Sequence, residues 1–216
     1  MAAPRKFDRD AVLERAMHLF WRRGYEATSL DDLVKAMGVN RASLYATFRS
    51  KQDLFLAAFD RYLSDFAAPI MSALSDPDPR RGIRRMLETI RDRCADRRFP
   101  RGCFQTNAAL ECPGVSDEIA RAVADSMNGL ESAIYDTLRR AQAAGVLDSA
   151  RDARRLARFF LGVAQGMNVV NKATGNAAML RDMIEEAMTV WSEFAAITVN
   201  TSTERKGRST ASRVMR

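Results

Sequence analysis

Two short helical patterns meet across a glycine turn within residues 24–51, and this spacing restricts the fold more than any other feature of the chain. Ser29 and Asp32 form an S-x-x-D capping box at the start of the first pattern, which ends near Gly38. Asn40 caps the second pattern, which ends near Phe48. A connection of about three or four residues between two such helices is what a helix-turn-helix requires. The stretch therefore predicts a helix-turn-helix.

The second helix of this motif presents small and polar residues on its outward face. Leu44 and Phe48 lie four residues apart and are expected to face inward. Small residues at the start of the helix let it approach base edges in a major groove. Lys51 falls in the first turn of the following helix, where a cation opposes the helix dipole, and this placement favours a phosphate partner. The motif is therefore predicted to bind DNA.

The same stretch resembles the DNA-binding motif of the TetR/AcrR family of bacterial repressors. The family often has a histidine or aromatic residue touching phosphate at the position of Thr47, so this chain departs from the pattern there. The resemblance implies a dimeric transcription regulator with a ligand-binding or sensor site in its second half. It rests on Gly24, Tyr25, Thr28, Ser29, Leu30, Gly38, Val39, Ala42, Leu44, Tyr45, Phe48, Lys51 and Leu54.

The DNA contacts are predicted partly from chemistry and partly from this resemblance. Hydroxyl and amide groups at helix starts suit phosphate, and an arginine grips guanine with two hydrogen bonds. Ser29 has an alternative explanation, because capping alone accounts for it. The predicted contacts are Thr28, Ser29, Asn40, Arg41, Ala42, Ser43, Tyr45, Thr47 and Lys51.

Composition sets broad limits on the class of protein. The chain has 216 residues, 47% of them hydrophobic, and is long enough to bury a core in one good-sized domain or two small ones. A formal net charge of +7 favours an anionic partner such as nucleic acid. No run of about 18 apolar residues and no signal-peptide core is present, so we expect a cytoplasmic protein without a membrane partner.

Apolar residues recur at helical spacing along the whole chain, which predicts an all-α fold of about nine helices. A three-helix DNA-binding head is expected in residues 1–50, a helical ligand-sensing and dimerisation body in residues 51–200, and a basic, disordered tail in residues 201–216. The head is preceded by a short basic arm, residues 1–6. Helices of the body are predicted from Lys51 past Phe66 and over residues 79–98, 103–111, 116–144, 150–174 and 176–199.

The last two of these helices are apolar over more than one stripe, so each must bury a second face. We assign that face to a homodimer interface; the alternative is that both helices lie at the centre of a monomer. Gly162 and Gly166, four residues apart, allow another helix to approach closely. The predicted interface residues are Phe160, Gly162, Gly166, Met167, Met183, Ala187 and Trp191.

A ligand site in the body follows from the family resemblance, and its inducer is expected to be apolar or electrophilic. Eleven methionines would let a pocket adapt to varied apolar molecules. Taken singly, each candidate other than Cys103 is better explained as ordinary core than as a ligand contact. The candidates are Phe66, Met86, Ile90, Cys103, Phe104, Asn107, Met127, Leu130, Tyr135, Phe159 and Val163.

Cys103 opens a predicted helix, so the positive helix end and the nearby Arg97, Arg98 and Arg101 would favour its thiolate. The run from Gly102 onward also resembles a TetR subgroup that senses electrophiles or oxidants through this cysteine. The alternative is a small, buried and inert side chain. Both interpretations stay open.

No metal or cofactor is expected. Cys94, Cys103 and Cys112 are spaced nine apart without a C-x-x-C, and the single histidine, His18, lies far from them in sequence. An odd number of cysteines argues against a disulfide scaffold. On one straight helix Cys103 and Cys112 would lie on opposite sides and about 13 Å apart, so any disulfide switch would be intermolecular or would involve Cys94.

The predicted function is a dimeric repressor that leaves a near-palindromic operator when a small molecule binds or a thiol is modified. An enzyme is not expected, because nucleotide-binding, nucleophile-elbow and zinc-protease motifs are missing from the sequence. The alternatives are a helical interaction module and an activator-type DNA-binding protein without ligand control.

Overall fold

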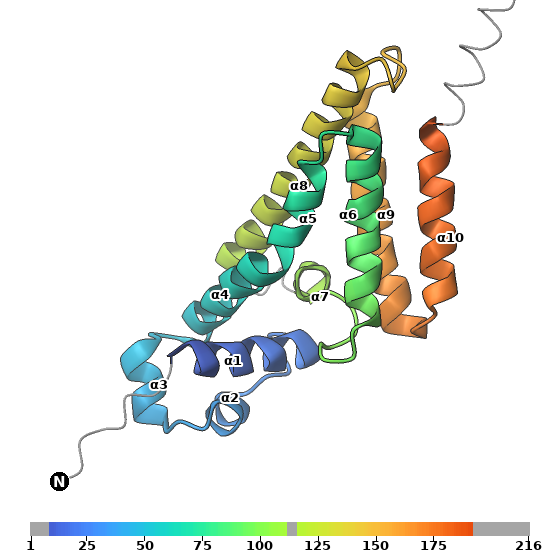
Figure 1. The fold of residues 1–216 in the computed structure, drawn as a ribbon. Helices are drawn as coiled ribbons and strands as arrows, with labels where there is room; N and C mark the ends of the chain where they lie inside the picture. The colour runs from blue at the N-terminus through green and yellow to red at the C-terminus, as the bar shows by residue number, and fades with distance from the viewer. Residues whose placement is uncertain (1–8, 112–115, 192–216) are drawn as a thin grey trace, which may run out of the picture.

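The computed structural model describes residues 9–111 and 116–191, and these are helical without any strand. A small head sits at one end of a taller helical bundle (Figure 1). The prediction of an all-α fold with an N-terminal helix-turn-helix head is confirmed. The head comprises α1 (Arg9–Arg23), α2 (Leu30–Met37) and α3 (Arg41–Thr47). The remaining helices are α4 (Lys51–Tyr62), α5 (Ala68–Leu74), α6 (Pro79–Ala95), α7 (Phe104–Glu111), α8 (Asp117–Ala143), α9 (Ala153–Thr174) and α10 (Ala177–Met188).

The head is closed by apolar stripes that its short helices turn toward one another. Phe20 and Trp21 of α1 are at most 1% exposed, as are Leu33 of α2 and Leu44 of α3. Burying a side chain of this size stabilises the fold by about 1.5–3 kcal/mol, so these four residues offset a part of the entropy lost in ordering three short helices.

The core of the head continues into the body through α4 and α7. Phe55 of α4 packs edge to face against Phe20 of the head and Phe104 of α7, with ring centroids 5.0 and 5.1 Å apart. Ile119 and Val123 of α8 complete the same buried cluster. In Figure 1, α7 lies between the head and the long helices of the bundle. A movement of α7 therefore changes contacts on the head as well as in the body.

A second buried cluster holds α5, α6, α8, α9 and α10 together as a bundle. Met86 of α6, Ile134 of α8 and Phe160 of α9 are completely buried in it. Leu180 and Ile184 fix α10 against the same core. Since each of these helices is amphipathic, the bundle forms by turning the apolar stripes inward.

The structure corrects the expected course of the helix that begins at Lys51. Its α-helical part ends at Tyr62, and a π-helical turn over Leu63–Ala67 joins it to α5. Pro69 lies in the first turn of α5, where its missing N–H removes one helical hydrogen bond. π turns inside helices recur at functional sites, and this one lies beside the cavity described below.

Other helix ends differ from the predicted ones by a few residues. α6 ends at Ala95, because Asp96 takes an extended backbone and binds Arg98 instead of continuing the helix. α9 begins at Ala153, where the Asp152 side chain accepts hydrogen bonds from two backbone N–H groups. α10 is followed by a 3₁₀ turn over Thr189–Trp191. The predictions for residues 1–6, for Cys112 and for residues 192–216 lie outside the described residues.

The predicted dimer interface was wrong for four side chains. Phe160 and Met167 are completely buried, and Ala187 and Trp191 are 2% and 3% exposed, all within the core of a single chain. The second apolar stripe that suggested an interface instead packs against α6 and α8. Gly162 is exposed, whereas Gly166 and Met183 are half-buried. None of the described helices is long and apolar enough to span a membrane.

Candidate functional site

The helix-turn-helix is built by the predicted caps. The Ser29 hydroxyl oxygen accepts a hydrogen bond from the Asp32 N–H at 3.1 Å, and the Asp32 carboxylate accepts one from the Ser29 N–H at 3.1 Å. Gly38 ends α2 at a φ of 69°, a left-handed conformation that favours glycine. The Asn40 side-chain oxygen accepts from the Ser43 N–H at 2.7 Å and so starts α3.

The outer face of α3 carries several of the predicted DNA contacts. Tyr45 is 47% exposed although it is a large aromatic side chain, and Ala42 beside it is also exposed. Arg41 is exposed too, and its Nη2 donates to the Asp31 carboxylate of α2 at 2.7 Å. An ion pair this exposed contributes little stability, so Arg41 can exchange Asp31 for a base or a phosphate at small cost.

Several predicted contacts have structural partners of their own. Thr28 is completely buried and its hydroxyl donates to the Gly24 carbonyl at 2.6 Å, so its predicted contact with phosphate was wrong. The Thr47 hydroxyl donates to the Ser43 carbonyl at 3.1 Å. The Lys51 ammonium lies 4.3 Å from the centre of the Tyr25 ring, which holds it by a cation–π contact.

Arg49, which was not predicted, also lies on this surface. Its side chain is 96% exposed in the corner between α3 and α4 and pairs with Asp53 at 3.3 Å. An arginine between Phe48, the buried residue that follows α3, and Ser50, the cap of α4, was the available signal. It adds a positive charge beside the recognition helix, where a phosphate backbone would pass.

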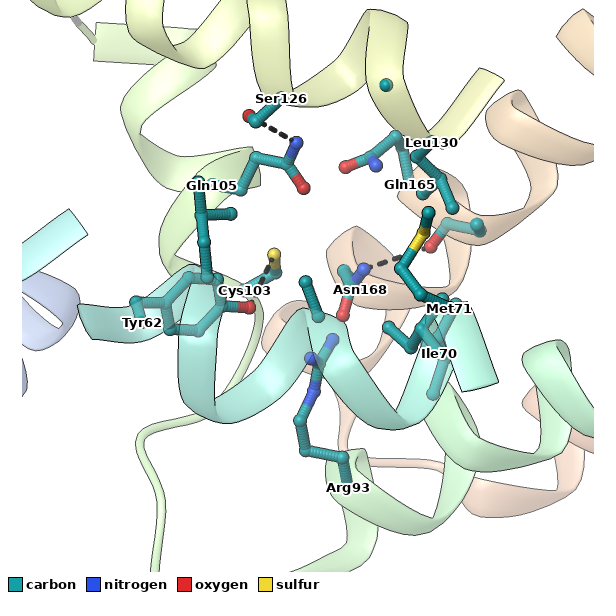
Figure 2. Close-up of a pocket in the computed structure, with 15 residues that line it drawn as sticks. Tyr62, Ile70, Met71, Arg93, Cys103, Gln105, Ser126, Leu130, Gln165 and Asn168 are labelled. Atoms are coloured by element: carbon teal, nitrogen blue, oxygen red, sulfur yellow. Dashed lines mark hydrogen bonds between the residues drawn. The ribbon is translucent and has the colours of Figure 1, made fainter. Parts of the chain in front are cut away.

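The body encloses a cavity of about 210 Å³ near the head. Figure 2 shows its side chains converging from five parts of the chain: the α4–α5 segment, α6, the start of α7, α8 and α9. Three of the predicted ligand residues, Ile90, Cys103 and Leu130, line it. Side chains that were not predicted include Tyr62, Ile70, Met71, Arg93, Gln105, Ser126, Gln165 and Asn168.

Some predicted ligand residues belong instead to the aromatic and apolar packing beneath the head. Phe66 packs against Trp21 at 5.2 Å, and Phe104 packs against Phe55. Met127 lies against the same cluster. These side chains hold the head on the body and do not line the cavity, so their assignment to the ligand was wrong.

The other predicted ligand residues lie elsewhere in the bundle. Met86 and Val163 pack in the core of the bundle. Tyr135 packs there as well, with its ring centre 3.8 Å from the Arg154 guanidinium. Phe159 is 47% exposed on the outside of α9. Helical periodicity identified all four as apolar positions. It could not show whether each side chain packs in the core, lies on the surface or lines a cavity.

The surroundings of Cys103 agree in part with a reactive sensor thiol and in part with an inert buried side chain. It is only 2% exposed, yet it lines the cavity at the start of α7. Its sulfur lies 3.0 Å from the Tyr62 hydroxyl oxygen and 3.5 Å from the Thr106 nitrogen, the N–H of which points toward it from the first turn of the helix. Burial raises the pKa of the Tyr62 phenol well above its ordinary value, and the neighbouring thiol adds to the shift.

The arginines expected to activate Cys103 lie elsewhere. Arg98 binds Asp96 at 2.6 Å, and Arg101 packs beside Gly175 at the end of α9. Arg97 lines a separate surface hollow. The arginine that faces the cavity is Arg93 of α6 (Figure 2).

Arg93 was missed because no charged residue was considered for the cavity. It follows Met86 and Ile90 by seven and three residues, so it continues the apolar stripe of α6. Its guanidinium lies 6.0 Å from the Tyr62 ring centre and 5.9 Å from that of Phe66. A cation on an apolar stripe was the signal available in the sequence.

α7 connects the cavity with the head. At its start, Cys103 and Gln105 line the cavity. Further along, the Asn107 amide donates to the Trp21 carbonyl at 3.0 Å, which is a role in head attachment and not the predicted ligand contact. At its end, the Glu111 carboxylate accepts hydrogen bonds from the backbone N–H groups of Tyr25 and Glu26 at 2.9 and 2.5 Å.

Asn107 also ties α7 to the body, because its amide oxygen accepts a hydrogen bond from the Lys172 ammonium of α9 at 2.8 Å. One side chain thereby contacts the last turn of α9 and the backbone at the end of α1. Within the described residues, acidic, histidine and cysteine side chains form no group of three or more that would hold a metal ion.

Comparison with known proteins agrees with this architecture. Residues 12–58 match the family described as bacterial regulatory proteins, tetR family, and residues 79–187 match the tetracyclin repressor-like C-terminal domain. The HTH-type transcriptional repressor ComR of Escherichia coli is 33% identical over 193 residues, covering 88% of this chain and 92% of ComR. The uncharacterized HTH-type transcriptional regulator YezE of Bacillus subtilis is 32% identical and is covered over 99% of its length, again against 88% of this chain.

A solved structure of similar fold contains DNA. It is a cysteine mutant of the TetR family transcriptional regulator CifR complexed with 26bp double-strand operator DNA, with a TM-score of 0.82 and 34% identity over 88% of this chain and all of that one. The chain described here belongs to the TetR family of transcriptional regulators. It is a DNA-binding regulator and not an enzyme.

Proposed function

We propose that this protein is a homodimeric repressor that leaves a near-palindromic operator when a small molecule occupies the cavity or when Cys103 is modified. Residues 1–50 would bind DNA and residues 51–200 would sense the ligand and dimerise, in the cytoplasm of a bacterium. The name of ComR as a repressor and the operator DNA bound to CifR support the direction of the proposal.

The observation that carries the proposal is the position of α7. One end of this short helix lines the cavity, and the other binds two backbone N–H groups of the head through Glu111. A ligand that pushes Cys103 or Gln105 must move α7, because the helix is only eight residues long and moves as one body. The inducer then weakens operator binding by the ratio of its affinities for the two positions of the head.

Dimerisation is supported by the outer face of α9. Phe159 and Val169 are each 47% exposed there, and Gly162 between them leaves room for a second helix. Two copies joined through this face would carry two recognition helices, and a spacing of about 34–36 Å or a multiple of it would match successive major grooves on one side of the duplex. The same symmetry predicts an operator with two inverted half-sites.

The test begins with selection of bound duplexes from random DNA, which yields an operator and shows whether it is palindromic. Tyr45→Ala is expected to abolish gel-shift binding to that operator while light scattering still reports a dimer. Met179→Ala, which truncates a comparably exposed side chain on α10, is the control and should bind like the wild type. Unchanged affinity of the Tyr45 variant would exclude this DNA face.

Repression is distinguished from activation by transcription in vitro from a promoter that contains the selected operator. The proposal predicts fewer transcripts as the protein is added, and recovery when the thiol reagent N-ethylmaleimide is present. An increase in transcripts on addition of the protein would favour the activator instead.

A further inference from the structure

We infer that the cavity binds a small organic anion, whose charged group pairs with Arg93 and whose apolar part packs against Ile70, Met71 and Leu130. The inference rests on the proposed role of the cavity as the inducer site and names the chemical class of the inducer. Carboxylates are the simplest members of that class.

Arg93 has no anionic partner in the described part of the chain. Its Nε atom is inaccessible to solvent and makes no hydrogen bond, and the titratable groups that couple to it are Tyr62, Cys103 and Cys94, with no carboxylate among them. The other arginines of α6 differ, because Arg81 pairs with Asp76 at 2.6 Å and Arg84 with Glu185 at 2.7 Å. Arg93 is thus the arginine of α6 that is turned inward and left without a counter-ion.

Leaving a half-buried guanidinium, with its Nε shut off from solvent, without a partner is costly, and structures retain such groups where they have a use. The rings of Tyr62 and Phe66 compensate for part of the lost hydration by cation–π contact. Burial opposes the charge, but the ordinary pKa of a guanidinium lies so far above neutral that Arg93 stays protonated. A permanent positive charge therefore faces the cavity.

The remaining lining suits an anion with an apolar tail. Among the described residues, no aspartate or glutamate lines the cavity to neutralise Arg93. The guanidinium points toward the space between Tyr62, Cys103 and Asn168, whereas Ile70, Met71 and Leu130 lie on another side of it (Figure 2). Gln105 and Gln165 extend toward the cavity from α7 and α9 and place amide groups near the same space.

The size of the cavity limits the ligand to a small molecule. Its volume of about 210 Å³ is roughly seven times the ~30 Å³ share of one water molecule in the liquid. Most sites for drug-sized ligands occupy ~300–1,000 Å³, so this cavity is below that range. Short-chain and single-ring carboxylates fit this limit.

The test uses two pairs of probes that match in shape and differ in charge: hexanoate with hexanamide, and benzoate with benzamide. Isothermal titration calorimetry of the full chain without DNA should show at least about tenfold tighter binding of a carboxylate than of its amide in one pair or both. Equal affinities within both pairs, or no binding of either carboxylate, would overturn the inference.

Three variants assign the preference to Arg93. Arg93→Met is expected to remove the preference for the carboxylate, and Arg93→Lys to keep most of it because the charge remains. Arg80→Met is the matched control, since Arg80 is an exposed arginine of the same helix. A preference that survives in Arg93→Met would overturn the inference.

Thermal unfolding tests whether Arg93→Met loses binding only because the variant is less stably folded. Arg93→Met should have a Tm equal to or above that of the wild type, because it removes an uncompensated buried charge, and a Tm lowered by more than about 5 °C would indicate that Arg93 serves folding. Failure of the proposed function looks different: the carboxylate would bind through Arg93 while operator affinity stayed the same. If carboxylates fail but N-ethylmaleimide still releases the operator, the anion inference alone is wrong.

Discussion

Arg41 and Arg93 show how the two working surfaces of this protein differ. Arg41 lies in the open on the recognition helix and pairs with Asp31 at 2.7 Å. Arg93 lies inside the body, over two aromatic rings, and has no carboxylate beside it. The exposed Arg41 can exchange its carboxylate partner at low cost. Arg93, in contrast, has no carboxylate partner among the described residues and can accept one from a ligand.

The contrast follows from the medium around each charge. At the surface, water screens the ion pair, so exchanging Asp31 for guanine or phosphate alters little except specificity. In the cavity, a charge interacts more strongly because fewer water molecules surround it, and the gain from an incoming anion is larger. Operator choice and inducer response thus depend on one type of side chain in two environments.

The largest effect is expected on operator affinity when Arg41, the exposed one of the two arginines, is replaced. Arg41→Ala should weaken binding to the selected operator by about 1–3 kcal/mol, or roughly 5- to 150-fold, because a two-pronged contact to a base is lost. Asp31→Ala is the control and should bind as well as the wild type or better, since it frees Arg41. Fluorescence anisotropy at fixed salt measures both, and equal affinity of Arg41→Ala would remove Arg41 from the base contacts.

The thiol beside the buried arginine gives the next test. Cys103→Ser should bind the operator within about twofold of the wild type but lose the release by N-ethylmaleimide, which in such regulators amounts to roughly 5- to 150-fold. Cys94→Ser is the matched control. The pKa of the Cys94 thiol is raised to about 11, chiefly by burial, so it is a poor nucleophile near neutral pH. A Cys103→Ser protein that is still released would contradict the account.

The connection between the two surfaces is tested at Glu111. Glu111→Gln replaces charge-assisted hydrogen bonds to the Tyr25 and Glu26 N–H groups by neutral ones, a loss of about 1 kcal/mol. The ratio of operator affinities without and with N-ethylmaleimide should therefore change by roughly fivefold. Glu185→Gln, which breaks a distant ion pair with Arg84, should leave that ratio as it is. An identical ratio in both variants would exclude α7 as the link.

Asp76 is a buried anion with two arginine partners, in contrast to Arg93, a cation without a carboxylate partner. Changing Asp76 is expected to have a smaller effect, and on stability. This carboxylate is 7% exposed and binds Arg81 at 2.6 Å and Arg85 at 3.2 Å. The hydrogen bond from Arg81, with help from the Asp78 N–H and Arg85, holds the pKa of Asp76 well below its usual range. A depressed carboxyl pKa adds stability above the unfolded-state value near 4, and that stability is lost as the pH falls below it.

Urea unfolding at pH 7 and pH 3 checks this sign. The wild type should lose more stability between the two pH values than Asp76→Asn, which cannot titrate at this position. Asp78→Asn serves as the control, because this neighbouring carboxylate accepts hydrogen bonds from the backbone N–H groups of Arg80 and Arg81 and not from the guanidinium groups that bind Asp76. Equal losses in the wild type and Asp76→Asn would show that the pair does not stabilise the fold in this way.

The helix-turn-helix of the head was predictable because the contacts that cap its helices are local in sequence. Ser29, Asp32, Gly38 and Asn40 each act within four residues of their own position, so their spacing in the sequence equals their arrangement in space. Thr28 was the exception. Its polar side chain suggested a contact with phosphate, but a carbonyl four residues away, that of Gly24, takes its hydrogen bond.

The cavity was predictable only in part, because five parts of the chain far apart in sequence assemble it. Ile90, Cys103 and Leu130 were identified, while Phe66 and Met86 have the same helical spacing and are core. Periodicity tells which side of a helix is buried but not whether a side chain or a void lies opposite. The same limit explains the interface error at Phe160, because a second apolar stripe can face either another chain or a helix of its own.

Amide hydrogen exchange at Tyr25 and Glu26 tests the central claim most directly, since Glu111 at the far end of α7 binds these two N–H groups. The account predicts that filling the cavity, with a carboxylate probe or by alkylation of Cys103, speeds exchange at both amides in the same range in which operator affinity falls. Unchanged exchange at these two positions in protein that has released its operator would contradict it.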